Sequence, residues 1–402
     1  MKILVILPRF PYPLEKGDKL RAYHQIRMLA RNNEVYLFAL THERVEETSL
    51  QEMQRFCKEI VVARISKILA FFYVVRNLFT VRSLQIGYWD SRKAMRQLRQ
   101  FEACVRPDVL YSQMVRTIRY AAHSDLPKVI DFQDALSMNL ERRMATRRGI
   151  PYFVLHYEFK MLRSAEYNAT SLFDGMTIIS EKDRDAIPQH HSTAIDVVRN
   201  GVDFDYFSPV DVKKRYDIVF SGNMQYKPNI DAARYLVNEV MPYVLAAHPG
   251  TTVLLAGATP AAAVRQLASQ LVIVTGTVDD IRPCYAISTI FVAPMRIGSG
   301  LQNKLLEAMS MGIPCVTTSL ANDSLGATDG QHILVGDTPT QIADAIIRLI
   351  DDKNLCKTLA ENAKAFVRSH YSWESAGDAL ESILQRAITT HRSHEKSQLE
   401  DE

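Results

Sequence analysis

Residues 293–318 read APMRIGSGLQNKLLEAMSMGIPCVTT. A strand is expected to end at Pro294, and the glycine-bearing loop at 298–300 leads into a helix predicted over Leu301–Met311. Glycines in such a loop let the backbone approach a ligand closely, and the free N–H groups at the positive end of a helix suit an anion such as a diphosphate. Because a further strand, Pro314–Thr317, follows, the stretch predicts a strand–helix–strand unit of a parallel sheet.

The same alternation of short apolar runs and amphipathic stretches extends along the chain. In the first half, strands are predicted at Lys2–Leu7, Glu34–Leu40, Val109–Tyr111, Lys128–Phe132 and Gly175–Ile179, with a helix at Lys19–Asn32. In the second half, strands are predicted at Asp217–Phe220, Thr252–Ala256, Leu271–Thr275 and Thr289–Ala293, with helices at Ile230–Leu245 and Ala261–Gln270. Such alternation is typical of parallel sheets covered by helices on both faces.

Two such series predict an α/β chain of two Rossmann-like domains whose parallel sheets face across a cleft. The first domain is expected over residues 1–207 and the second over 208–372. Residues 373–402 are expected to hold a last helix, Trp373–Ile388, and a disordered polar tail from His391. Ligands of parallel sheets bind beyond the carboxyl ends of the strands, so the loops that follow strands are the expected site.

The composition is that of an ordinary soluble protein, with 47% hydrophobic and 23% charged residues among 402. A formal charge of +3 gives no reason to expect a nucleic-acid partner. The five cysteines form no C-x-x-C pair, which favours reduced core thiols in a cytoplasmic protein over a metal site or disulfides. The N-terminal run MKILVILPRF is interpreted as a buried strand, and Ile68–Val75 is too short to span a bilayer.

The helix predicted at Leu301–Met311 has two different faces. The face expected to pack on the sheet carries Leu301, Leu305, Ala308 and Met309. The face expected to meet a ligand carries Gly300, Asn303, Lys304 and Glu307. Glu307 is suited to accept hydrogen bonds from the two vicinal hydroxyls of a ribose, and Lys304 to lie near a phosphate. The alternative is a surface ion pair between these two residues, worth only about 0.2–0.5 kcal/mol.

Residues 307–316, EAMSMGIPCV, resemble the signature of the retaining family 4 of glycosyltransferases, whose architecture is called GT-B. The family's signature has a further glutamate that would fall at Ser299, and that acid touches the donor sugar. Residues 298–309 instead match the pattern G-x-G-x-x-N-K-x-L-E-A-M of a subgroup of bacterial polysaccharide transferases. The resemblance implies transfer from a nucleotide-diphosphate sugar, with sugar contacts that differ from those of the main family.

Two stretches before this signature resemble the same family. Residues 199–203, RNGVD, are similar to its segment at the domain junction, although an ordinary Asn-Gly turn also accounts for the dipeptide. In FSGNMQYKPN, residues 220–229, Gly222 and Asn223 stand where the family has a glycine–arginine pair that holds the diphosphate. Lys227 is the best cation for the leaving phosphate, and a solvated loop lysine is its alternative interpretation.

Residues 275–280, TGTVDD, resemble the loop that brackets the nucleotide base, with contacts mainly through the backbone. Trp373 resembles the tryptophan that opens the family's last helix, which crosses back to the first domain. The resemblance therefore implies a donor site lined by Gly17, Gly222, Asn223, Lys227, Gly276, Val278, Gly298, Ser299, Gly300, Leu301, Asn303, Lys304 and Glu307.

The first domain is expected to hold the acceptor. Gly17 stands where the family has a glycine-rich loop, and Arg21, one turn into the following helix, is also placed to face the cleft. After the strand Lys128–Phe132, Asp131 and Asp134 are candidates to orient the acceptor hydroxyl, since relatives often carry a histidine or aspartate there. The alternative is that one of them caps the next helix, a role that suits Asp134 well.

Two other stretches have compositions that bear on function. Arg64–Arg82 combines basic and aromatic residues, which suits peripheral contact with the inner leaflet of the cytoplasmic membrane. A buried helix with polar ends is the equal alternative. His190 and His191 have no carboxylate or cysteine at ligand spacing, so a surface loop is the preferred interpretation.

The sequence thus predicts a retaining glycosyltransferase that moves a sugar from a UDP- or GDP-sugar to a glycan or lipid-linked acceptor of a bacterial surface polysaccharide. Catalytic roles are assigned to Asp131, Asp134, Lys227 and Glu307. We expect no metal and no cofactor, because lysine and helix dipole can stabilise a leaving diphosphate. The alternatives are a nucleotide-sugar epimerase of the same architecture and a non-catalytic nucleotide-sugar-binding protein.

Overall fold

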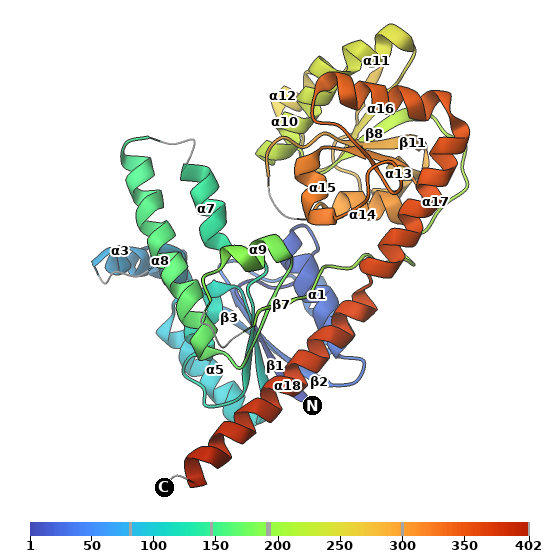
Figure 1. Ribbon diagram of the computed structural model, residues 1–402. Helices are drawn as coiled ribbons and strands as arrows, with labels where there is room; N and C mark the ends of the chain where they lie inside the picture. Colours follow the sequence, from blue (N-terminus) through green and yellow to red (C-terminus); the bar gives the residue numbers. More distant parts are fainter. Residues whose placement is uncertain (80–82, 145–147, 190–193, 299–300, 401–402) are drawn as a thin grey trace. The chain divides into compact units, whose positions relative to one another are not determined.

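The chain folds into two compact units. The computed structural model describes residues 1–79, 83–144, 148–189, 194–298 and 301–400, and Figure 1 shows its ribbon. Unit 1 comprises Met1–Asn200 together with Trp373–Glu402, and unit 2 comprises Gly201–Ser372. The chain therefore passes from unit 1 to unit 2 after residue 200, where the sequence predicted a boundary after 207. It passes back into unit 1 at Trp373.

Unit 1 is built on a seven-stranded sheet of order β3-β2-β1-β4-β5-β6-β7, in which every neighbouring pair is parallel. Its strands are β1 Lys2–Leu7, β2 Glu34–Thr41, β3 Cys57–Arg64, β4 Val109–Gln113, β5 Lys128–Asp131, β6 Gly175–Ile178 and β7 Asp196–Val197. All residues of β1 except Lys2 are buried, as in a strand covered on both faces. Because β1, β4 and β5 are neighbours, the loops that follow them meet at one edge of the sheet.

Helices cover both faces of this sheet (Figure 1). They are α1 Gly17–Leu29, α2 Glu47–Gln54, α3 Lys67–Phe79, α4 Leu84–Trp89, α5 Arg92–Val105, α6 Ile118–Ala121, α7 Leu136–Met144, α8 Ile150–Leu172, α9 Glu181–Ala186 and α18 Trp373–Glu400, with a short 3₁₀ turn at Val115–Thr117. Although α18 comes last in the chain, it packs on α1 and on β4, β5 and β6. The ring of Trp373 stacks on His24 of α1 at 4.5 Å between centroids.

The polar tail predicted to be disordered from His391 is helical as far as Glu400, so that prediction was wrong over these residues. No proline interrupts residues 373–400, and α18 therefore has no strong internal stop signal. Two contacts with unit 1 hold its later part: Arg386 pairs with Asp196, and the His391 ring lies 3.1 Å from Asp174.

Unit 2 contains a six-stranded parallel sheet of order β10-β9-β8-β11-β12-β13. Its strands are β8 Tyr216–Ser221, β9 Val253–Ala256, β10 Val272–Val274, β11 Ser288–Ala293, β12 Cys315–Thr317 and β13 Leu334–Val335. Its helices are α10 Lys227–Tyr235, α11 Met241–Ala247, α12 Ala262–Arg265, α13 Arg282–Ala286, α14 Asn303–Ser310, α15 Ser319–Leu325, α16 Pro339–Asp351 and α17 Lys353–His370. The two parallel sheets confirm the predicted class of two Rossmann-like domains.

Two predicted helices of unit 2 differ from the structure. The helix expected over Ile230–Leu245 is interrupted by a π-helical turn at Leu236–Val240, directly before Pro242 of α11, whose ring nitrogen cannot donate a helical hydrogen bond. The helix expected over Ala261–Gln270 is reduced to α12, and within the rest of the expected range Ser269 Oγ accepts hydrogen bonds from the backbone N–H groups of Leu271 and Val272 and so forms a turn.

Within the described residues, no helix combines the length and the apolar character needed to cross a membrane. The predicted histidine pair, His190 and His191, lies outside the described residues.

Candidate functional site

The loops at the carboxyl ends of β8 and β9 pack backbone against backbone in unit 2. Gly222 and Gly257, one after each strand, have φ angles of +155° and +145°. A Cβ atom at Gly257 would lie 1.8 Å from the carbonyl oxygen of Gly222, and one at Gly222 would lie 2.6 Å from Asn229 Nδ2. Glycine is therefore required at both positions, which lets the two loops pack closely at this edge of the sheet.

Glu307 of α14 is held in place by a chain of hydroxyl groups. The Tyr285 hydroxyl donates to Glu307 Oε2 at 2.9 Å and lies 2.6 Å from Ser221 Oγ at the end of β8. Tyr285 is fully buried, whereas Glu307 is half-buried and only its Oε2 is engaged among the described residues. Burial raises the pKa of the Glu307 carboxyl, against the opposing effects of Tyr285 and Lys304. The second oxygen remains available as an acceptor.

Lys304, on the same helix, reaches the loop after β8. Its Nζ donates to Asn229 Oδ1 at 2.6 Å and lies 4.8 Å from the centre of the Phe220 ring. Burial lowers the pKa of Lys304 to about 8, although Glu307 acts in the opposite direction. Lys304 and Glu307 form no ion pair with each other, so the alternative of a surface pair was wrong: each has a different partner.

The apolar face of α14 packs as predicted. Leu305, Ala308 and Met309 are fully buried, and Leu301, which precedes the helix, is partly buried against the same core. The first residue of the helix, Asn303, leaves its Oδ1 buried without a hydrogen-bond partner among the described residues. An unpartnered buried acceptor is costly, so this oxygen is suited to accept a hydrogen bond from a donor group of a ligand.

The other residues predicted for the donor site differ in exposure, hydrogen bonding and backbone conformation. Lys227 is the exposed first residue of α10, and Asn223 accepts a hydrogen bond from the Gln225 N–H at 3.0 Å. Gly276 and Gly298 have positive φ angles, +77° and +119°. Val278 packs against the core. Ser299 and Gly300 lie outside the described residues. Neither α10 nor α14 has a side-chain cap. In α10 the second residue is Pro228 and the Asn229 N–H donates to the Tyr226 carbonyl, so an anion would meet mainly the first two N–H groups of α14.

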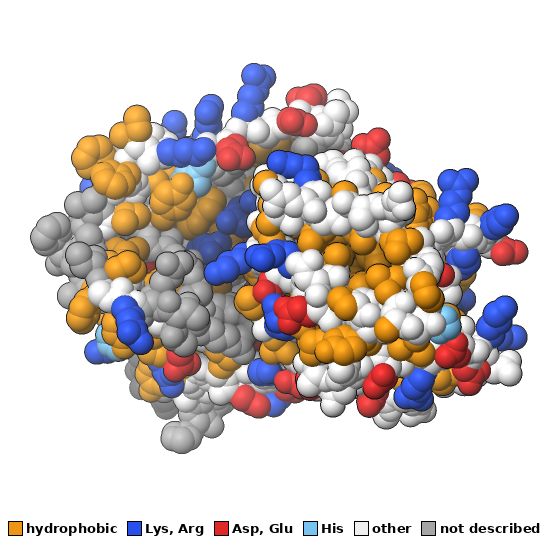
Figure 2. All heavy atoms as spheres, turned by 90° about the horizontal axis from the view of Figure 1, so that it is seen from above, with side chains coloured by type: hydrophobic (Ala, Val, Ile, Leu, Met, Phe, Trp, Pro, Cys, Tyr) orange, Lys and Arg blue, Asp and Glu red, His pale blue; other side chains and the backbone are white. Residues whose placement is uncertain are grey.

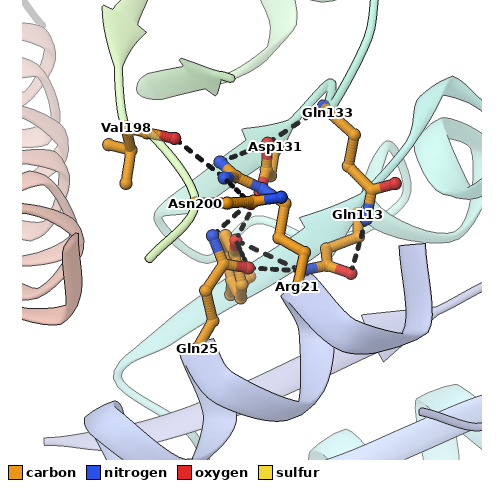
Figure 3. Close-up of polar contacts among 8 residues, drawn as sticks. Arg21, Gln25, Gln113, Asp131, Gln133, Val198 and Asn200 are labelled. Carbon is orange, nitrogen blue, oxygen red and sulfur yellow. Dashed lines mark hydrogen bonds and ion pairs between the residues drawn. The ribbon is translucent and has the colours of Figure 1, made fainter. Parts of the chain in front are cut away.

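In unit 1, Asp131 forms a buried ion pair with Arg21 (Figure 3). The Arg21 Nε donates to Asp131 Oδ2 at 2.7 Å and Nη2 to Oδ1 at 3.2 Å. Arg21 Nη1 also donates, at 2.8 Å, to the Val198 carbonyl and to Asn200 Oδ1. Both side chains of the pair are almost completely buried, so Arg21 does not present its guanidinium to solvent. Loss of either partner would leave an uncompensated buried charge.

The network continues through uncharged side chains toward the loops that follow β4 and β5. Gln25 Nε2 and the Gln133 N–H donate to Asp131 at 3.1 and 3.0 Å, and the Tyr111 hydroxyl lies 3.0 Å from Oδ2. Gln133 Nε2 in turn donates to Gln113 Oε1 at 3.2 Å. All these side chains are buried. The Asp131 carboxylate is thus engaged on both oxygens and suited to position the loop rather than to contact an acceptor.

Asp134 is different, because its carboxylate accepts no hydrogen bond from the described residues. Burial raises its pKa to about 6, and the neighbouring charge of Asp183 adds to this shift. The alternative of a helix cap was wrong: at the start of α7, Asp183 Oδ1 accepts from the Ala135 N–H and Glu166 Oε1 from the Ser137 N–H. Asp134 is therefore free to meet a ligand.

Sequence reasoning missed the strained residues beside these loops. Met114, which follows β4, has φ +64°, and Gln133, two residues after β5, has φ +62°. Non-glycine residues adopt such angles mainly where surrounding contacts hold them, and they are frequent at functional sites. Gly17, by contrast, begins α1 with nothing within 4 Å of the place where a Cβ would lie. No steric requirement explains the glycine there.

Among the described residues, no group of three or more histidine, cysteine, aspartate or glutamate side chains is arranged to hold a metal ion.

Comparison with known proteins gives independent information. Residues 215–352 match the model of the family described as Glycosyl transferases group 1. An uncharacterised 44.6 kDa protein in the cps region of Klebsiella pneumoniae is 23% identical over 396 residues, which cover 92% of this chain and 96% of that protein. A GDP-mannose-dependent monoacylated α-(1-6)-phosphatidylinositol monomannoside mannosyltransferase of Corynebacterium glutamicum is 29% identical over 160 residues, 37% of this chain and 42% of that protein.

Among solved structures, HepE of Anabaena in complex with UDP has a TM-score of 0.68 at 13% identity, with 96% of this chain and 100% of that one covered. The likeness at this identity shows the fold, and the family match covers most of unit 2. Together, these findings show the GT-B fold and support a glycosyltransferase.

Proposed function

We propose that the chain is a retaining glycosyltransferase that moves a hexosyl group from a UDP- or GDP-sugar to a glycan or lipid-linked acceptor in bacterial surface polysaccharide synthesis. The observation that carries the proposal is the placement of Glu307 and Lys304. Both lie at the carboxyl edge of the unit 2 sheet, beside two uncapped helix starts and the glycine loops. An acceptor for ribose hydroxyls next to cationic groups for phosphates fits a nucleoside diphosphate.

The proposed chemistry depends on stabilising the leaving diphosphate. The N–H groups at the start of α14, with Lys227 and Lys304, supply positive charge as the sugar–phosphate bond breaks, so the reaction is proposed to need no metal ion or cofactor. The acceptor hydroxyl attacks the anomeric carbon on the face that the diphosphate leaves. Its proton passes to the departing phosphate oxygen, and Asp134 orients the hydroxyl. Activity that survives exhaustive chelation would support this assignment, and activity restored only by an added divalent cation would contradict it.

The nucleotide base is the first point to test. HepE of Anabaena was solved with UDP, whereas the corynebacterial mannosyltransferase is GDP-mannose-dependent. Titration calorimetry with a panel of nucleoside diphosphates distinguishes the two. We expect Glu307→Ala to weaken binding of the preferred nucleotide about a hundredfold, because it would remove two charge-assisted hydrogen bonds. Ser299→Ala is expected to change this affinity little. Equal binding by wild type and Glu307→Ala would overturn the assignment.

Transfer itself needs a separate assay. Incubation of the protein with radiolabelled donor and a bacterial lipid extract is expected to move label into the lipid or glycan fraction. Turnover of the nucleotide sugar without any acceptor would instead indicate an epimerase. Donor binding without transfer to any extract would indicate a non-catalytic binding protein.

We also propose that unit 1 contacts the membrane surface through α3. Ile68, Phe71 and Phe72, spaced to share one face of this helix, are 71%, 63% and 62% exposed. This exposure argues against the alternative of a buried helix. Arg64 and Lys67 beside them are exposed cations, and Figure 2 shows hydrophobic and basic side chains side by side at its upper left. Apolar side chains flanked by cations suit an anionic bilayer.

Vesicle co-sedimentation tests this contact. We expect the protein to bind phosphatidylcholine vesicles that contain phosphatidylglycerol and the Phe71→Ser/Phe72→Ser variant to lose most of that binding. Tyr243→Ser, which removes an exposed aromatic ring from unit 2, is the control. Equal sedimentation of both variants and wild type would exclude α3 as the contact.

A further inference from the structure

A cavity of about 540 Å³ lies in unit 1 at the carboxyl ends of β1 and β2. Its walls are the loop between β1 and α1, the loop after β2, the first residue of α3 and the end of α4. The volume is within the roughly 300–1,000 Å³ of typical small-ligand pockets. We call it the basic–aromatic pocket. It has room for one or two sugar rings and a phosphate.

The lining carries more cations than acids. It includes Arg9, Lys16, Lys19, Arg44 and Lys67, and the carboxylates Glu15, Glu43 and Glu46. Arg9 is paired with Asp18 at 2.7 Å, and Lys67 lies 3.7 Å from Glu43. Among the described residues, the side chains of Lys16, Lys19 and Arg44 have no hydrogen-bond or ion-pair partner. The carboxylates of Glu15 and Glu46 also have no partner among the described residues, so the unpaired groups of the lining are three cations and two acids. The excess of cations favours an anionic ligand, and a phosphate accepts charge-assisted hydrogen bonds from several cations at once.

Aromatic side chains form another wall of the pocket. The His42 ring packs between Tyr88 and Trp89, with 4.4 Å between its centroid and each of theirs. Its Nδ1 lies 3.1 Å from the Ile65 carbonyl oxygen, which can only accept, so Nδ1 carries the proton. Nε2 is then a bare acceptor, buried without a partner among the described residues. A ligand that offers an apolar face, as a sugar ring does, complements this wall.

The pocket shares lining residues with two other features of unit 1. Lys67, which lines it, is the first residue of α3, whose exposed apolar face is the proposed membrane contact. Arg9 and Lys19 line it too, and they also line a small neighbouring cavity with Gln113 and Gln133. The pocket is therefore adjacent to α3, the helix proposed to lie on the bilayer, and to the residues around Gln133, one position before Asp134.

We propose that the basic–aromatic pocket binds the acceptor as a sugar phosphate, with the phosphate at Lys16, Lys19 and Arg44 and the sugar ring on the His42–Tyr88 wall. The inference rests on the proposed transferase function and narrows its substrate class. Because this phosphate site adjoins α3, the helix proposed to lie on the bilayer, the enzyme acts on the first sugars next to a lipid phosphate. The reaction that supplies this substrate must therefore be a transfer of a sugar or sugar phosphate to a lipid phosphate.

Calorimetry on the full-length protein tests the proposal, with the donor site saturated by the nucleoside diphosphate that binds best. The probes are glucose 1-phosphate, galactose 1-phosphate and N-acetylglucosamine 1-phosphate, the matching methyl glycosides, and inorganic phosphate. At least one sugar 1-phosphate is expected to bind about tenfold more tightly than its methyl glycoside and than inorganic phosphate, the effect of one charge-assisted contact.

The variant Lys16→Ala/Arg44→Ala is expected to abolish this tenfold preference without changing nucleotide binding. Both side chains are exposed, so the fold should be unaffected. Lys93→Ala/Arg99→Ala on α5, with the same loss of charge at exposed positions, is the control and should retain the preference. Equal binding of phosphorylated and neutral sugars, or no binding of either, would overturn the proposal. So would a preference that survives in Lys16→Ala/Arg44→Ala, or inorganic phosphate binding as tightly as the sugar phosphates. Absence of nucleotide binding would contradict the transferase function instead.

Discussion

At the scale of single residues, the hydroxyl of Tyr285 decides how Glu307 is presented. It donates to Glu307 and also contacts Ser221, so Tyr285→Phe removes two buried hydrogen bonds while it retains the ring. We expect nucleoside diphosphate affinity to fall about fivefold, equivalent to one typical hydrogen bond. Tyr235→Phe is the control, because that buried tyrosine contacts only the Asp337 carbonyl through its hydroxyl. If both variants bind nucleotide as wild type does, Tyr285 does not position Glu307.

Lys304 gives the donor site a pH dependence. Burial lowers its pKa to about 8, so the charged form, which a diphosphate prefers, becomes a minority above that pH. Affinity for the nucleotide is therefore expected to fall between pH 7 and pH 9, with proton uptake on binding near pH 8. Calorimetry in buffers of different ionisation enthalpy measures both effects. Lys304→Met should bind more weakly and lose the uptake, and identical uptake by wild type and this variant would assign the proton to another group.

At neutral pH, the ionised carboxylate of Asp134 is expected to lower the free energy of unfolding and to support transfer activity. Its pKa in the folded protein is about 6, above the value of about 4 for an unfolded chain, so the folded state binds the proton more strongly. The free energy of unfolding should fall as pH rises from about 4 to about 6, because the unfolded state ionises first. Asp134→Asn is thus expected to raise the melting temperature at pH 7, with no gain near pH 4, and to lower transfer activity.

The control for this variant is Asp125→Asn, which neutralises an exposed carboxylate of the same unit. It should change neither melting temperature nor activity. A melting temperature of Asp134→Asn below that of wild type at pH 7 would show that the ionised carboxylate stabilises the fold.

The sequence predicted only part of this residue-level arrangement. The spacing of Asn303, Lys304 and Glu307 along one helix determines that they share a face, and the structure confirms the apolar face opposite to them. Tyr285 and Asn229 could not be found in this way, because they come from other elements and meet Glu307 and Lys304 only after the sheet is assembled. The pairing of Arg21 with Asp131 could not be predicted from local spacing either, because the two residues are 110 positions apart in the sequence.

At the scale of elements, the close approach of the loops after β8 and β9 leads to a prediction for the stability of a glycine variant. Gly257→Ala would place a Cβ atom 1.8 Å from the Gly222 carbonyl oxygen, which cannot be relieved by a rotamer change. We expect the free energy of unfolding to fall by about 3 kcal/mol or more. Gly250→Ala, where nothing lies within 4 Å of the added atom, should be neutral. Thermal unfolding of both variants measures the difference, and equal melting temperatures would show that the loops separate easily.

Element predictions succeeded where a pattern was long and buried. The residues of β1 form one apolar run, and its predicted bounds agree with the structure. Two helix predictions failed where a single residue changes the local hydrogen bonding. Ser269 forms a turn after α12, and Pro242, the second residue of α11, follows the π-helical turn. The prediction from sequence also failed from His391 onward, where polar composition indicated disorder but the helix continues to Glu400, and Arg386 and His391 contact the rest of unit 1.

At the scale of the whole molecule, the chain returns to unit 1 for its last helix. Leu380, Leu384 and Trp373 of α18 belong to the same buried cluster as Ile3 and Ile26 of unit 1. Unit 1 thus completes its core only when the last residues are present. The two units should consequently differ in their dependence on α18.

Truncation after Ser372 tests this difference. Removal of α18 would expose the apolar surface around His24 and β5, so we expect limited proteolysis to degrade unit 1 rapidly. Unit 2, whose core contains no residue after Tyr371, should remain as a protected fragment that still binds the nucleoside diphosphate. Truncation after Arg392 is the control, because it keeps the buried positions of α18 up to Ile388, and it should protect both units. Loss of nucleotide binding on truncation after Ser372 would show that unit 2 depends on α18 for its fold.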